Sequence, residues 1–148
     1  MSYQERRAIV SVLSTAVIWG LYFSYMLQRY PEGNAYSPEV FKYWGTVFAI
    51  LIPVTIVARI LIIVLFSILN TIATRVEEPE FTDERDRLIS LKATRNSTLV
   101  FIVGFALGMT TLAFDIPPVA MFIVFFISGV VSEMVSELSE LYFYRRGV

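Results

Sequence analysis

Residues 47–70 read VFAILIPVTIVARILIIVLFSILN, an apolar stretch in which Arg59 is the one charged side chain. An α-helix needs about 20 apolar residues to cross roughly 30 Å of hydrocarbon. We therefore predict that this stretch is a membrane-spanning helix. The apolar run extends from residue 40 to residue 74, so we expect the excess to tilt, bend at Pro53 or lie in the interface.

Three further apolar stretches of suitable length predict three more spans, over residues 8–27, 97–114 and 119–144. The first is too long for a signal-peptide core, so we expect it to be retained. Residues 30–34 and 115–118 have turn composition, and Ser37 followed by Pro38 predicts a helix start. The predicted fold class is an all-α integral membrane four-helix bundle that forms a single transmembrane domain over residues 1–148.

Basic residues are unequally divided between the two ends of the predicted spans. One side carries Arg29 and Lys42. The other carries Arg6, Arg7, Arg75, Arg85, Arg87, Lys92, Arg95, Arg145 and Arg146. Because basic residues accumulate in cytoplasmic loops, we expect both termini in the cytoplasm and the spans in the cell's inner membrane.

The composition excludes several kinds of chemistry. The chain has no cysteine and no histidine, which excludes disulfides, thiolate or imidazole metal sites and any Ser-His or Cys-His nucleophile pair. Its formal net charge is −1, without the basic surface typical of nucleic-acid binding. We expect a lipid bilayer as its surroundings, and no nucleic-acid partner, cofactor, metal or enzymatic activity.

Arg59 is the most informative single residue. A guanidinium in the middle of a span costs at least about 2.5 kcal/mol unless it is paired or reaches water. The fourth span offers acids that recur at spacings of four and three and share one face, beside a stripe of serines. The predicted intramembrane polar cluster consists of Arg59, Glu133, Glu137, Glu140, Ser132 and Ser136. Within it we predict a contact of Arg59 with Glu133, and with Glu137 as the second choice.

This predicted buried ion pair has more than one interpretation. It is either a structural clamp that fixes how the helices pack, or the lining of a polar vestibule for a cation or proton. A third reading is that the Arg59 side chain reaches the headgroups alone. The clamp is the commoner role of such pairs, and the sequence leaves all three open.

Small residues predict a close approach of helices. Gly104 and Gly108 form a GxxxG pattern in the third span, and Gly129, Ser132 and Ser136 form a small stripe in the fourth. We predict packing between these two spans. A homodimer contact is the alternative.

The polar connection over residues 75–96 contains most of the soluble charge. Thr82 is placed to cap an amphipathic helix at the membrane surface, acidic in its first turn and basic in its last, with Leu88 and Leu91 on one face. Six acids lie close together in this connection: Glu77, Glu78, Glu80, Asp83, Glu84 and Asp86. Their spacing matches no known calcium loop, so a solvated linker is favoured over a divalent-cation site.

The segment from residue 82 to residue 93, TDERDRLISLKA, resembles a cytoplasmic signature of small prokaryotic four-span membrane proteins of unknown function. The shared pattern is an acidic Asp-Glu-Arg start, an apolar position, and a Lys-Ala pair before the next span. Its matching residues here are Asp83, Glu84, Arg85, Asp86, Arg87 and Lys92. The resemblance implies the four-span layout but no reaction, cofactor or catalytic residue.

Two functional hypotheses follow from these patterns. The first is a non-enzymatic, homo-oligomeric sensing or docking module whose cytoplasmic connection binds a protein partner. The alternative is a small cation or proton transporter or channel that uses a polar path along the fourth span. An intramembrane enzyme is disfavoured because no nucleophile and base are paired.

Overall fold

In a computed structural model of the chain, residues 3–31, 34–74 and 84–146 are described. The helices are α1 (Tyr3–Gln28), α2 (Pro38–Thr74), α3 (Glu84–Ala113) and α4 (Pro118–Arg146). In this described part, all four helices are long and apolar enough to cross a membrane. The prediction of an all-α chain with four long apolar helices is confirmed.

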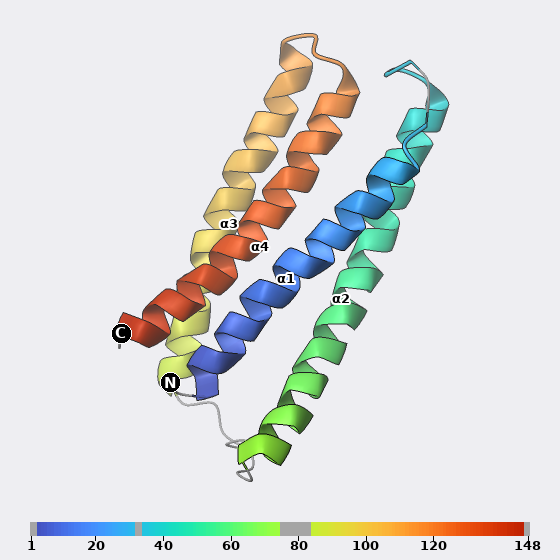
Figure 1. The fold of residues 1–148 in the computed structure, drawn as a ribbon. Coiled ribbons are helices and arrows are strands. Elements are labelled where there is room, and N and C mark those ends of the chain that lie inside the picture. Colours follow the sequence, from blue (N-terminus) through green and yellow to red (C-terminus); the bar gives the residue numbers. More distant parts are fainter. Residues whose placement is uncertain (1–2, 32–33, 75–83, 147–148) are drawn as a thin grey trace.

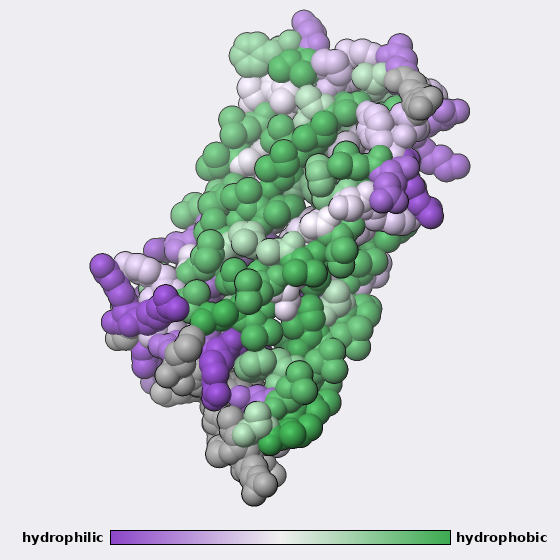
Figure 2. All heavy atoms as spheres, viewed as in Figure 1, coloured by the Kyte–Doolittle hydropathy of each residue, from purple (hydrophilic) through white to green (hydrophobic). Residues whose placement is uncertain are grey.

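The helices form two hairpins, α1 with α2 and α3 with α4 (Figure 1). α3 packs along α4, α4 packs against α1, and α1 packs against α2. The turn of each hairpin lies at one end of the molecule, which we call the hairpin end. The two chain termini lie near the opposite end, the terminal end. A broad apolar surface separates the polar ends (Figure 2).

Ser37 and Pro38 start α2 as their residue types predict. The N–H group of Val40 donates to Ser37 Oγ at 3.4 Å and to the Ser37 carbonyl oxygen at 3.1 Å. Pro38 has no N–H group to satisfy in the first turn, where helical N–H groups lack intrahelical acceptors. This cap fixes where α2 leaves the loop and therefore how it faces α1.

The turn between α3 and α4 depends on Asp115, whose φ of 56° is in the left-handed region. Its N–H group donates to the Leu112 carbonyl at 3.4 Å, and that of Ile116 donates to the Thr111 carbonyl at 3.1 Å. These bonds satisfy carbonyl groups that the end of a helix leaves unpaired. The chain can then reverse at once, which keeps α3 and α4 together along their length.

An aromatic core joins α1, α2 and α4 toward the hairpin end. Its buried residues are Trp19, Tyr22, Met26, Val40, Trp44, Val47 and Phe126. The Trp44 ring stacks on Phe122 with centroids 5.7 Å apart, and Trp19 meets Phe126 edge to face at 5.2 Å. We call the half of the molecule that contains this core the hairpin half, and the other the terminal half.

α2 behaves differently in the terminal half. Beyond Val47, no described residue of this helix is buried. Most of its large apolar side chains there are exposed, among them Ile60, Leu61, Ile63, Val64, Leu65, Ile68, Leu69 and Ile72. A helix that is apolar around its circumference and unburied by protein suits hydrocarbon surroundings. Pro53 lies inside α2 and does not end it.

α3 is one continuous helix from Glu84 to Ala113, whereas the sequence predicted a separate surface helix before the third span. Ile89 and Ala93 are buried, at 1% and 0% exposure. Leu88 and Leu91, predicted to form the apolar face, are exposed. α4 extends to Arg146, so it gives the start of α3 a surface to pack on. The predicted cap Thr82 lies outside the described residues.

Candidate functional site

Two carboxylates of α4 meet one guanidinium of α2 in the terminal half. Glu133 and Glu137 are four residues apart, so their side chains leave the same face of α4. Arg59 Nη2 donates to Glu133 Oε1 and, at 2.9 Å, to Glu137 Oε1. The structure therefore brings together three of the four charged residues that the sequence singled out. Glu137 lies eight residues before Arg145, or about 12 Å along the helix axis.

α1 supplies the remaining hydrogen-bond donors to these carboxylates. Ser11 Oγ and Thr15 Oγ1 donate to Glu137 Oε1 at 2.8 and 2.7 Å. Trp19 Nε1 donates to Glu133 Oε2 at 2.6 Å. We call this group the carboxylate cluster, and it consists of Ser11, Thr15, Trp19, Arg59, Glu133 and Glu137.

The sequence interpretation missed the contribution of α1. Ser11, Thr15 and Trp19 are spaced by four residues, which places their polar groups on one side of α1. That spacing was visible in the sequence. It did not show which neighbouring helix this side faces.

The charges of the carboxylate cluster do not balance. Arg59 carries one positive charge against two negative charges when Glu133 and Glu137 are both ionised. Glu137 Oε1 accepts three hydrogen bonds, whereas its buried Oε2 has no partner among the described residues. An unpaired charged oxygen in a buried position is unfavourable, because it has lost water without gaining another donor.

The cluster is enclosed by protein on one side only. The Glu137 side chain is 5% exposed and that of Glu133 is 24% exposed, but the Arg59 side chain is 47% exposed. The predicted buried ion pair is therefore buried at Glu137, partly buried at Glu133 and half exposed at its guanidinium. The reason is that α2 has no buried residue here, so none of the described helices covers the outer flank of Arg59.

The other members of the predicted polar cluster have different positions. Glu140 lies three residues beyond Glu137 on α4, where it interacts electrostatically with Glu137 and Arg7. Within the described residues, neither Ser132 nor Ser136 bonds to the carboxylates, because the donors come from α1 and α2. The serine stripe instead contacts α3 further along, where Asn96 Nδ2 donates to Ser139 Oγ at 3.3 Å.

The predicted glycine stripe lies between α3 and α4, with one correction. A Cβ atom at Gly104 would overlap the Ser128 side chain, and one at Gly108 would overlap the Phe125 ring. A Cβ atom at Gly129 would meet nothing within 4 Å. The small residue of α4 that faces Gly104 is therefore Ser128, one position and about 100° around the helix from Gly129.

The residues of the Asp-Glu-Arg segment are spread around the start of α3. Glu84, Arg85 and Arg87 are exposed, whereas Asp86 lies beside Tyr144 and the Lys92 ammonium lies 5.7 Å from the Phe143 ring centroid. Asp83 and the acids from Glu77 to Glu80 lie outside the described residues. Among the residues that are described, no three acidic side chains converge as a metal site would need.

No family model, curated protein or solved structure matches this chain. The carboxylate cluster must therefore be interpreted from its own geometry. In that geometry, two carboxylates share one guanidinium and accept hydrogen bonds from four residues. The group lies in the apolar part of the molecule.

Proposed function

We propose that the protein is a non-enzymatic, multi-pass membrane protein whose carboxylate cluster binds a proton or a monovalent cation, as the central site of a small transporter or channel. The observation that supports this most is the buried Glu137 Oε2, which has no donor within the described residues. A proton on this oxygen, or a cation beside it, would satisfy the oxygen and neutralise the excess charge together.

The cluster contains one carboxylate more than a structural clamp needs. Arg59 alone would be neutralised by one carboxylate in a structural clamp. With both Glu133 and Glu137 on the same nitrogen, the guanidinium stabilises one negative charge and leaves the second for a transported ion. The hydroxyl groups of Ser11 and Thr15 accept as well as donate hydrogen bonds, so they suit either a proton or a cation.

Movement past the cluster requires a change at Trp19. This residue donates to Glu133 and also packs in the aromatic core, on the route from the cluster to the hairpin end. We propose that loading of the cluster weakens the Trp19 bond to Glu133, which opens the aromatic core. On the terminal-end side, Glu140 is the next acid of α4 after Glu137, and it interacts electrostatically with Arg7.

The proposed setting is the cytoplasmic membrane, with four spans in a bundle and both termini in the cytoplasm. In the described residues, the helix segments at the terminal end carry Arg6, Arg7, Arg85, Arg87, Arg145 and Arg146, while the hairpin end carries Arg29 and Lys42. This asymmetry supports the orientation. A homo-oligomer is part of the proposal, because the exposed flank of Arg59 needs polar surroundings that a second copy provides.

Flux in proteoliposomes tests the proposal. Purified protein is reconstituted with a pH-sensitive or potassium-sensitive dye inside, and the wild type is compared with Glu133→Gln and Glu137→Gln. Each variant keeps the side-chain shape and removes one charge, so we expect at least about a tenfold loss of flux. Glu39→Gln is the matched control, because this exposed glutamate lies outside the cluster. Equal flux in the wild type and both cluster variants would end the proposal.

A second candidate is the docking of a protein partner by the first turns of α3. The supporting observation is that α4 covers only one side of this segment. Ile89 and Ala93 are buried, while Leu88 and Leu91 are 57% and 59% exposed beside the exposed Arg85 and Arg87. An apolar pair next to charged residues is a common composition for a binding surface.

Site-specific photo-cross-linking separates this second candidate from simple contact with lipid. A photoreactive residue is placed at Leu88 and, as a matched control on the same helix, at the exposed Leu107 in the apolar part of α3. Docking predicts a discrete protein adduct at position 88 and lipid adducts at position 107. Lipid adducts alone at both positions would exclude docking through this surface.

A further inference from the structure

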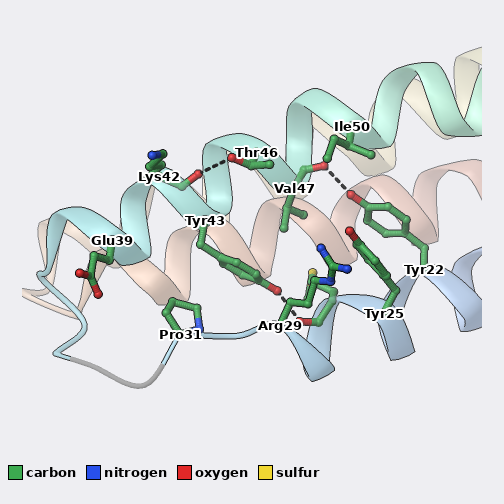
Figure 3. Close-up of a pocket in the computed structure, with 11 residues that line it drawn as sticks. Tyr22, Tyr25, Arg29, Pro31, Glu39, Lys42, Tyr43, Thr46, Val47 and Ile50 are labelled. Carbon is green, nitrogen blue, oxygen red and sulfur yellow. Dashed lines mark hydrogen bonds between the residues drawn. The ribbon is translucent and has the colours of Figure 1, made fainter.

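A cavity of about 370 Å³ lies at the hairpin end, between the last turns of α1 and the first turns of α2 (Figure 3). It contains no residue of the carboxylate cluster, although Tyr22, Met26 and Val47 belong both to its lining and to the aromatic core. Its two walls are held together by tyrosines. Tyr22 Oη donates to the Val47 carbonyl at 2.6 Å, and Tyr43 Oη donates to the Met26 carbonyl at 2.6 Å. The cavity is therefore a fixed feature of the α1–α2 contact.

The lining changes from apolar to charged. The apolar side chains of Met26, Val47 and Ile50 form part of the wall on the side nearer the aromatic core. Arg29, Lys42 and Glu39 lie nearer the hairpin end, where the chain leaves α1 and enters α2. Such a gradient matches an amphipathic ligand with a charged head and an apolar chain.

Arg29 is the group best placed to bind the head of such a ligand. Its guanidinium carbon lies 4.7 Å from the centroid of the Tyr25 ring and projects between the two helices (Figure 3). Stacking on a ring occupies the face of a guanidinium and leaves its N–H edge available for an anion. No carboxylate among the described residues forms an ion pair with Arg29.

We propose that this cavity binds an anionic phospholipid, with its phosphate on the N–H edge of Arg29 and the start of an acyl chain along Val47 and Ile50. Two basic residues against Glu39 favour an anionic head over a zwitterionic one. Guanidinium groups bind phosphate oxygens with paired, charge-assisted hydrogen bonds. The tyrosines match the depth at which aromatic residues meet lipid headgroups.

Native mass spectrometry of the full chain in detergent tests the proposal with defined lipids. The protein is titrated with phosphatidylglycerol and, in parallel, with phosphatidylcholine. We expect phosphatidylglycerol to bind at least about fivefold more tightly. Arg29→Gln should weaken phosphatidylglycerol binding about tenfold, the effect of losing one charge-assisted contact. Arg6→Gln at the terminal end is the matched control and should leave binding unchanged.

Two further measurements test whether the apolar wall takes part in binding and whether a free anion can replace the lipid. Ile50→Trp fills the apolar wall without changing any charge, and it should weaken phosphatidylglycerol binding as Arg29→Gln does. Inorganic phosphate at millimolar concentration should not displace the lipid, because it lacks the chain. Full displacement by phosphate would assign the site to a free anion instead. Equal binding of the two lipids, or unchanged binding in Arg29→Gln, would overturn the proposal.

Discussion

The hairpin half and the terminal half of this protein are held together in different ways. In the hairpin half, α1, α2 and α4 share a core of stacked aromatic rings in which Trp44 is 1% exposed. In the terminal half, no described residue of α2 is buried, and Arg59, whose side chain is 47% exposed, pairs with the carboxylates of α4. α2 is therefore joined to its neighbours by close packing in the hairpin half and by charge in the terminal half.

This difference suggests a division of roles. Apolar burial against lipid gives little driving force, so helices in a membrane are held by packing and by polar contacts. The aromatic core supplies the packing and keeps α2 in place. The terminal half is then free to place polar groups where their bonds can change, which is what a proton or cation site needs.

The largest expected effect is the loss of packing in the hairpin half. Trp44→Ala removes a side chain that stacks on Phe122, and we expect it to lower the free energy of unfolding by about 3–5 kcal/mol. Leu61→Ala is the matched change in the terminal half, and it should have almost no effect because Leu61 is 56% exposed. Unfolding in mixed micelles by a denaturing detergent measures both. Similar losses would remove the distinction between the halves.

The next effect concerns the charges of the terminal half. Arg59→Met leaves two carboxylates without their shared guanidinium, and we expect a loss of about 2 kcal/mol, below the range for a fully buried pair because Arg59 is half exposed. Adding Glu133→Gln and Glu137→Gln should restore most of the stability. The same unfolding assay tests this, and a triple variant no more stable than Arg59→Met would argue against charge imbalance as the cause.

The third effect concerns the indole N–H groups of Trp19 and Trp44, of which the first is hydrogen-bonded and the second has no partner among the described residues. Trp19→Phe removes the donor to Glu133 and should cost about 2 kcal/mol, as hydrogen bonds to charged groups do. Trp44→Phe removes a buried Nε1 that has no partner among the described residues, so the net change should stay within about 1 kcal/mol. Equal losses in thermal unfolding would show that ring volume and not the hydrogen bond decides the cost at Trp19.

The smallest effect concerns the α3–α4 contact, which extends through both halves. Gly104→Ala forces a Cβ atom into the Ser128 side chain, and we expect a loss of about 1 kcal/mol. Gly129→Ala meets open space and should instead gain about 0.5 kcal/mol from helix propensity. Thermal unfolding of the two variants measures the difference. A loss at Gly129 as large as that at Gly104 would mean that Gly129 meets a second copy of the chain.

Much of the fold was predictable because span length is a direct consequence of membrane thickness. The apolar runs predicted four long helices, and Ser37 with Pro38 predicted the start of α2. The continuity of α3 was not predicted, because the polar residues before Ser97 are as compatible with one long helix as with two. Only the packing of Ile89 and Ala93 beside α4 decides between these possibilities.

The candidate site was partly visible in the sequence. Arg59 indicated a need for carboxylate partners, since desolvation of a guanidinium is costly, and the spacing of Glu133 and Glu137 placed them on one face. The sequence did not show how α1 is rotated about its own axis, because a mostly apolar helix does not favour one face over another for contact with its neighbours. Only the structure therefore shows that the carboxylate cluster includes Ser11, Thr15 and Trp19. The same limit explains why Ser128 and not Gly129 faces Gly104.

We propose that the carboxylate cluster holds both of its negative charges only when a proton or a monovalent cation is bound. Carbon-13 NMR of glutamate-labelled protein in lipid nanodiscs measures this directly, with Glu133→Gln and Glu137→Gln used to assign the two carboxyl signals. We expect that at neutral pH one of these signals is that of a protonated carboxyl, or shifts when sodium or potassium is added. Two ionised carboxylates that respond to neither cation would contradict it.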